Sequence, residues 1–238
     1  MVGSFDEALR AVEKVDGWMT DEQARRLWDH AAGLRSGDQI VEIGSFRGRS
    51  AVVLASAAPD GVDVFAIDPH AGNDRGPQEI EGFADAAAVD HEVFHENLRA
   101  AGVDERVRHV RAFSLDALGK VEGDVHLLYI DGAHRFAPAL ADIRVWGGRV
   151  APGGTMLIHD SFSSVGVTFA ILRALAFGRR FRYAGRSGSM TEYRRQLVTG
   201  VGRVRNALAQ LAQVPWFLRN LAIKVLIVAK MKKGPWPY

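Results

Sequence analysis

The sequence predicts a doubly wound α/β protein built on a mostly parallel sheet. Its 238 residues suit one large domain with an appendage, and its 47% hydrophobic and 24% charged residues are typical of globular proteins. From residue 38 to about residue 195, short apolar runs alternate with stretches of helical periodicity, a pattern that requires crossover connections between parallel strands. Cysteine is absent, which excludes disulfides, iron–sulfur clusters and thiolate zinc sites.

The expected elements follow in order along the chain. Two short N-terminal helices are predicted by apolar residues at helical spacing, and the polar segment 69–90, which contains glycine and proline, indicates a functional loop. We expect helices at 5–12, 24–31, 50–58, 85–101, 136–149 and 164–177, strands at 39–43, 62–67, 107–112, 126–130 and 155–158, and a closing hairpin at 181–185 and 190–194. We therefore predict a Rossmann-like sheet of seven strands with an antiparallel last strand. The expected units are a helical cap (1–36), the sheet domain (37–196) and a basic helical extension (197–238).

The first strand-to-helix turn, residues 41–50 (VEIGSFRGRS), carries a cofactor signal. Gly44 allows a tight turn, and Gly48 lets the next helix begin close to a ligand. A dinucleotide fingerprint needs a glycine where this chain has Glu42, whose carboxylate repels pyrophosphate but suits an ammonium group. Asp68 ends the second strand, where an acid accepts hydrogen bonds from both ribose hydroxyls. An ammonium group and a ribose without phosphate describe S-adenosylmethionine (SAM).

The ends of the fourth and fifth strands carry a second signal. Asp131 and His134 lie in D-G-A-H after one strand, and His159 and Asp160 follow the next. Neighbouring strands would bring the two aspartates together, and two hard oxygen ligands suit Mg²⁺. A divalent ion there can bind adjacent hydroxyls of a substrate and lower the pKa of one of them. His134 is then the expected general base.

These motifs resemble known enzymes. E-x-G-x-x-x-G, the acid of the second strand and the stretch G-V-D-E-R-V-R resemble the class I SAM-dependent methyltransferases over roughly residues 38–195. D-G-x-H followed by H-D resembles the metal-dependent sugar O-methyltransferases that act on macrolide glycosides, the macrocin and mycinamicin type. The resemblance implies that Asp131 is a metal ligand and that His134 is the catalytic base.

The resemblance also implies the remaining site residues. In the family the second metal site is a pair of adjacent acids, so Asp160 matches and His159 does not. His159 is left with three alternatives: a metal ligand, a group that orients Asp160, or a substrate contact. The cofactor residues implied are Glu42, Gly44, Ser45, Gly48, Ser50, Asp68 and Asp131, with Ser114 and Asp116 near the adenine.

Several alternatives stay open at this point. A catechol-type or small-phenol O-methyltransferase, or a methyltransferase that needs no metal, would also use His134. A SAM- or nucleotide-binding module without activity would keep Glu42 and Asp68 but has no reason to carry D-G-x-H. The segment His91–His95 matches the zinc-peptidase pattern H-E-x-x-H, yet no further histidine follows at the peptidase spacing, so we expect an ordinary helix. His109 has no partner pattern, and we expect it to be structural.

Charge is divided unevenly along the chain. All 28 acidic residues lie at or before Glu192, so residues 1–192 carry a net charge of −7, whereas the last 46 residues carry nine basic side chains. The acidic body argues against nucleic acid as a partner. The stretch 208–228 mixes apolar and basic residues, which fits peripheral contact with an anionic membrane, a subunit contact in a homo-oligomer, or packing on the body. With no signal peptide and no uncharged apolar stretch of about 18 residues, we expect a cytoplasmic enzyme that acts on a small-molecule or oligosaccharide hydroxyl.

Overall fold

The computed structural model describes residues 3–71 and 83–230, and it confirms the predicted fold class. A seven-stranded sheet has the strand order β3-β2-β1-β4-β5-β7-β6, with β7 antiparallel to both of its neighbours. The strands are β1 (Gln39–Ile43), β2 (Asp63–Ile67), β3 (Val107–Val110), β4 (Val125–Ile130), β5 (Val150–Ile158), β6 (Phe181–Ser187) and β7 (Met190–Arg195).

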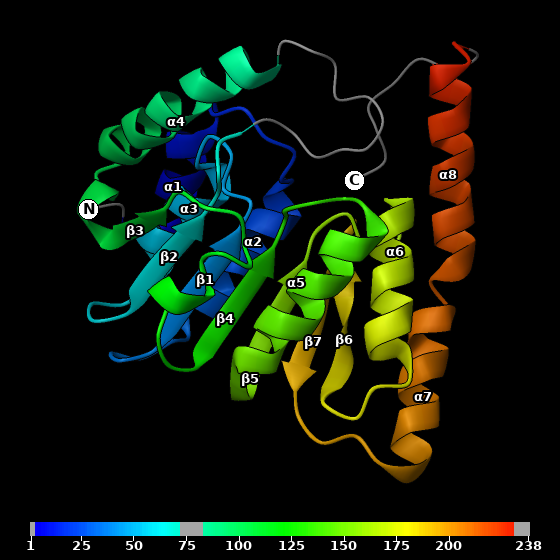
Figure 1. Ribbon diagram of the computed structural model, residues 1–238. Helices are drawn as coiled ribbons and strands as arrows, with labels where there is room; N and C mark the ends of the chain where they lie inside the picture. Colours follow the sequence, from blue (N-terminus) through cyan, green and yellow to red (C-terminus); the bar gives the residue numbers. More distant parts are fainter. Residues whose placement is uncertain (1–2, 72–82, 231–238) are drawn as a thin grey trace.

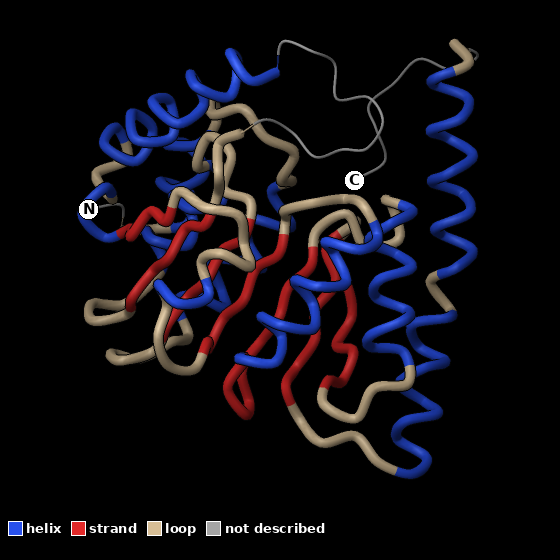
Figure 2. Tube along the Cα trace, in the orientation of Figure 1, coloured by secondary structure: helices blue, strands red, loops and turns tan. Residues whose placement is uncertain are grey.

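Helices cover both faces of this sheet (Figure 1). One apolar core lies between the sheet and α1 (Phe5–Val12), α2 (Asp21–Ala32), α3 (Arg49–Ala57) and α4 (Phe83–Ala100). A second core lies between the other face and α5 (Phe136–Arg149) with α6 (Val165–Ile171), which continues as a π-helical turn, Leu172–Ala176. The tube in Figure 2 shows the resulting three layers, helix, sheet and helix.

Local sequence explains where the first helices begin. Ser4 and Thr20 each accept a hydrogen bond from the backbone N–H three residues on, and the side chains at those positions, Glu7 and Gln23, bond back to the cap. These reciprocal bonds satisfy backbone groups that a helix end leaves without partners. Both helices therefore begin close to the predicted positions.

Two elements differ from expectation. Strand β5 begins at Val150 rather than residue 155, because Val150 already pairs with Val125 of β4. The register then shifts over a stretch that contains Pro152 and two glycines, before Thr155 pairs with Leu127. Helix α4 begins at Phe83 and so includes part of the segment 69–90 predicted as a loop. Residues 72–82 of that segment lie outside the described residues.

The C-terminal segment forms two helices, α7 (Gly200–Leu211) and α8 (Val214–Val228). Helix α7 is held to the body by Asn206, which accepts a hydrogen bond from the Tyr183 N–H (2.7 Å) and donates one to the Phe181 carbonyl (3.1 Å). Helix α8 lies beside α6 and rises past the carboxyl ends of the parallel strands (Figure 1). By length and composition alone, the helical stretch 200–228 is apolar enough to cross a membrane, which the sequence analysis did not expect.

Candidate active site

The predicted glycine turn lies directly against the end of β4. Gly44 has a left-handed φ of +87°. A Cβ atom on Gly44 would lie less than 3.0 Å from the Asp131 carbonyl oxygen, a distance at which the two atoms overlap. Gly48 also has a φ of +87° and is the N-cap residue of α3, where a Cβ atom would lie 3.2 Å from the Phe94 ring. Glycine is therefore required at both positions, and the turn brings the ends of β1 and β4 together.

A buried carboxylate lies beneath this turn. The Glu42 side chain is fully buried, and its Oε1 accepts a hydrogen bond from the Ser50 hydroxyl. Glu42 Oε2 has no hydrogen-bond partner among the described residues, although buried Ser45 is close by. Burial raises the pKa of the Glu42 carboxyl to about 7, against the opposing effect of Ser50. An unpartnered carboxylate oxygen at a cofactor turn fits a ligand that brings an ammonium group.

Asp68 joins the turns that follow β1 and β2. Its Oδ2 accepts a hydrogen bond from the Phe46 N–H (2.8 Å), and its Oδ1 accepts one from the His70 N–H (2.7 Å). Each carboxylate oxygen retains a second lone pair, so the side chain can still accept hydrogen bonds from two hydroxyl groups. Phe46 and His70 have left-handed φ values of 45° and 47°, a strained conformation that clusters at functional sites.

The residues after β3 differ in what they offer an adenine ring. The Ser114 hydroxyl donates to the buried Asp142 carboxylate, and the Ser114 carbonyl accepts from Trp146 Nε1 (3.1 Å). Asp116 is exposed, and Phe113, with 63% of its surface exposed, offers an aromatic face that the sequence analysis did not consider. Burial raises the pKa of Asp142 to about 6.

Asp131, His134 and Asp160 come together at the ends of β4 and β5. One ligand atom from each residue lies within 4.8 Å of the others, as the pairing of β4 with β5 predicts. His134 Nε2 is buried 2.9 Å from Asp160 Oδ2 but makes no hydrogen bond of good geometry. Two carboxylates at one point fit a divalent cation, with the His134 imidazole beside them.

His159 adjoins this cluster but is not one of the three residues whose ligand atoms lie within 4.8 Å of one another. Its Nδ1 lies 3.1 Å from Asp131 Oδ1 and 3.7 Å from Asp160 Oδ2, while Nε2 lies 3.3 Å from Gln23 Oε1. The Gln23 amide donates to Ser187 and Ser189, so its oxygen faces His159 as an acceptor.

Both ring nitrogens of His159 therefore face acceptors. Burial disfavours the charged ring, but Asp131 and Asp160 outweigh burial and raise the pKa of His159 to about 10. Without a metal, the His159 ring is thus paired with the carboxylates of both Asp131 and Asp160.

Sequence reasoning missed Gln23 and Tyr129. Gln23 comes from α2, 136 residues before His159, and no local pattern links the two. The Tyr129 hydroxyl donates to Asp131 Oδ2 (3.2 Å), a contact that the alternation of β4 could have suggested, because residues i and i+2 lie on one side of a strand.

The strand order, the glycine turn and the acid after β2 define a methyltransferase fold. Residues 41–161 match the family model described as a methyltransferase domain. The chain belongs to this family, and it is a SAM-dependent methyltransferase.

Solved structures of distant relatives share the fold. The chain is similar to the O-methyltransferase TomG from Streptomyces achromogenes, at 20% identity and a TM-score of 0.55, covering 82% of this chain and 89% of that one. It is similar to an O-methyltransferase from Bacillus cereus, at 18% identity and a TM-score of 0.56, covering 81% and 90%. It is also similar to the Podospora anserina methyltransferase PaMTH1, at 15% identity and a TM-score of 0.58, covering 81% and 87%.

Proposed function

We propose that the protein transfers a methyl group from SAM to a hydroxyl oxygen of a sugar, a glycoside or a polysaccharide precursor. The observation that carries this proposal is the cluster of Asp131, His134 and Asp160 beside the glycine turn. Because the Gly44 turn lies against the Asp131 backbone, a cofactor held by the turn and a hydroxyl held by the cluster would be neighbours.

The residues of the turn fit the cofactor. SAM, when bound, supplies a methyl group on a positively charged sulfur. Glu42 Oε2 is available to its ammonium group, and the two oxygens of Asp68 are available to the ribose hydroxyls. The exposed ring of Phe113 is a candidate to stack on the adenine.

We propose that Asp131 and Asp160 bind Mg²⁺, with His134 at the edge of the site. The ion, when bound, supplies positive charge that favours the deprotonated form of an acceptor hydroxyl. His134 Nε2 takes the hydroxyl proton, and the Asp160 carboxylate 2.9 Å away stabilises the charged imidazole that results. His159 and Tyr129 orient the Asp131 carboxylate from behind.

A sugar is favoured over a catechol by the resemblance of D-G-x-H to the sugar O-methyltransferases. A methyl-transfer assay on the full chain would test this, with SAM and matched panels of glycosides, nucleotide sugars and catechols, each with EDTA or with Mg²⁺. We expect methylated glycosides in Mg²⁺ and no product in EDTA. Methylation of catechols alone would overturn the sugar, and full activity in EDTA would overturn the metal and leave His134 as the base.

We also propose that α7 and α8 contact an anionic membrane surface. Eight large apolar side chains on these helices are exposed, and no acidic residue follows Glu192 in the sequence. The exposed apolar residues are Val201, Val204, Leu208, Leu211, Leu218, Val225, Leu226 and Val228. Each basic side chain near such a surface contributes roughly 1 kcal/mol, which favours a membrane over a neutral protein partner.

Vesicle sedimentation tests the membrane proposal. The double variant Val225→Ser/Leu226→Ser should bind less to phosphatidylserine vesicles, whereas Val89→Ser, at an exposed apolar residue of α4, should bind like wild type. Salt should weaken the binding, and pure phosphatidylcholine should not replace the anionic lipid. A change in oligomer size by light scattering, with vesicle binding unchanged, would instead assign the helices to a subunit contact.

A further inference from the structure

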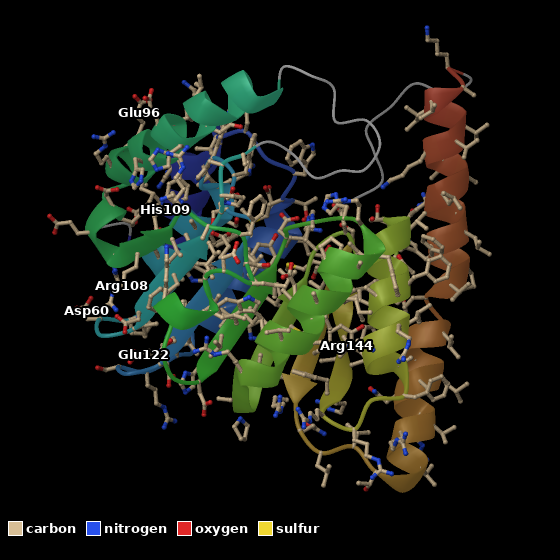
Figure 3. The ribbon with its side chains drawn as sticks, in the orientation of Figure 1. Asp60, Glu96, Arg108, His109, Glu122 and Arg144 are labelled. Carbon is tan, nitrogen blue, oxygen red and sulfur yellow. The ribbon has the colours of Figure 1, made fainter. Side chains whose placement is uncertain are left out.

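Three histidines meet at the edge of the sheet, away from the cluster described above. His91 and His95 lie one turn apart on α4, and His109 lies on β3. One ligand nitrogen from each lies within 4.8 Å of the others, and the ring centroids are 5.0–5.3 Å apart. Figure 3 shows His109 beneath α4, while Glu96 lies on the outer side of that helix. The third histidine of the cluster, His109, therefore comes from a strand and not from a later turn of the helix that carries His91 and His95.

The second nitrogen of two of these rings already has a partner. His95 Nδ1 lies 3.3 Å from Asp104 Oδ1, which leaves Nε2 for the cluster. His109 contacts the backbone of Asp68, and its Nε2 is buried without a hydrogen-bond partner among the described residues. A carboxylate or carbonyl behind a histidine is the usual arrangement at metal sites, because it fixes the ring and the nitrogen that bears the lone pair.

A fourth imidazole adjoins the cluster. The side chain of His70 is 1% exposed, and its Nε2 has no partner among the described residues. Its ring lies 5.0 Å from that of His109 and 5.3 Å from that of His91. A buried polar nitrogen without a partner is costly, and a cation bound by the neighbouring rings gives it one.

The charge of the surroundings suits a cation. Burial and the neighbouring histidines lower the pKa of His109 to about 4, and burial also lowers the pKa of His70 and His91, so these three rings are neutral near pH 7. The charged groups that act on the cluster are Asp68, Asp90, Glu92 and Asp104, opposed by Arg111.

We propose that His91, His95 and His109 bind Zn²⁺ and so tie α4 to the edge strand β3, with a fourth position beside His70. Imidazole nitrogen is a preferred ligand of zinc, whereas Mg²⁺ prefers oxygen. Zinc–nitrogen distances of about 2.0–2.1 Å require the three nitrogens to approach each other to about 3.4 Å. Zinc binding would therefore require the half-buried His91 and His95 side chains to move toward His109. The three proposed zinc ligands are separate from the carboxylates proposed to bind Mg²⁺.

Calorimetry with ZnCl₂ on the full chain, freed of metal, tests this proposal. The double variant His91→Gln/His95→Gln should weaken zinc binding by more than the roughly 10–100-fold that loss of a supporting carboxylate such as Asp104 costs. Glu96→Gln, on the exposed side of the same helix, should bind like wild type, and MgCl₂ should not compete.

A separate variant and a spectroscopic measurement keep the proposal falsifiable. Asp131→Asn/Asp160→Asn disables the carboxylate cluster and should leave this zinc equivalent in place. If the histidine double variant does not fold, nitrogen NMR of the wild-type imidazoles decides instead, because zinc should shift His91, His95 and His109 together. A tight zinc equivalent that survives in the histidine variant or disappears in the aspartate variant would overturn the proposal. So would zinc binding that leaves those three resonances unmoved.

Discussion

Replacing Gly44 by alanine is the sharpest test of how the cofactor turn and the acceptor cluster are joined. Gly44 combines a φ of +87° with a hypothetical Cβ atom that overlaps the Asp131 carbonyl oxygen. The backbone of β4 cannot retreat easily, because the Asp131 N–H donates to the Ile43 carbonyl (2.8 Å) and β4 is paired on both sides. The substitution must therefore move the turn, the end of β4, or both.

Gly37 provides a matched control for the loss of unfolding free energy that Gly44→Ala causes. Gly37 has a φ of +91° and nothing within 4 Å of a hypothetical Cβ atom, so Gly37→Ala carries only the cost of the left-handed conformation, about 1–2 kcal/mol. Gly44→Ala adds the overlap, and forcing extra volume into a packed site costs about 1–3 kcal/mol more. We expect Gly44→Ala to lower the free energy of unfolding by about 2–5 kcal/mol in total.

Urea denaturation followed by tryptophan fluorescence measures both variants under the same conditions. SAM affinity by calorimetry and methyl transfer should fall in Gly44→Ala and stay near wild type in Gly37→Ala, because only the first moves Asp131. Equal destabilisation of the two variants would refute the argument from close approach. Normal SAM binding by a folded Gly44→Ala protein would refute the role of the turn.

Three further outcomes are expected. His134→Ala should keep SAM affinity while turnover falls by about 10²–10⁴-fold in initial-rate assays, and an unchanged rate would remove His134 as the base. Asp68→Ala should weaken SAM binding by calorimetry, since charged hydrogen bonds contribute about 1.5–3 kcal/mol each, and an unchanged affinity would reject the ribose contact. Although burial opposes the shift, His30, Arg194 and Arg26 lower the pKa of Glu192 to about 2 in the folded protein. The ionised carboxylate therefore stabilises the fold fully at pH values above its unfolded pKa near 4.5, and this contribution is lost as the pH falls toward 2. The stability difference between wild type and Glu192→Gln should therefore shrink by up to about 3 kcal/mol between pH 6 and pH 2, and a difference independent of pH would contradict the pairing.

Elements set by local pattern could be predicted from the sequence. The buried strands are short apolar runs, and the glycine turn shows itself by a residue type that only a left-handed backbone requires. The meeting of Asp131 and Asp160 followed from one topological rule, that the carboxyl ends of neighbouring parallel strands share an edge. These inferences need no knowledge of side-chain packing.

Contacts set by packing could not be predicted in the same way. The surroundings of His159 include Gln23, whose amide donates to Ser187 and Ser189 at the turn between β6 and β7. His109 lacked a partner pattern because its partners lie on α4, and helix-to-strand packing decides which turn of that helix faces β3. In both cases the sequence shows the residue types, but only tertiary packing determines which residues they contact.

The two clusters offer different ligand atoms, and we therefore expect them to bind different ions. The proposed ligands Asp131 and Asp160 are carboxylates and suit a hard ion such as Mg²⁺, whereas His91, His95 and His109 offer only imidazole nitrogen. Affinity for zinc generally exceeds affinity for magnesium at nitrogen ligands, so excess zinc would fill the histidine cluster before it competes at the carboxylates. Zinc inhibition of methyl transfer should therefore begin only after one equivalent has bound, because the two sites share no ligand.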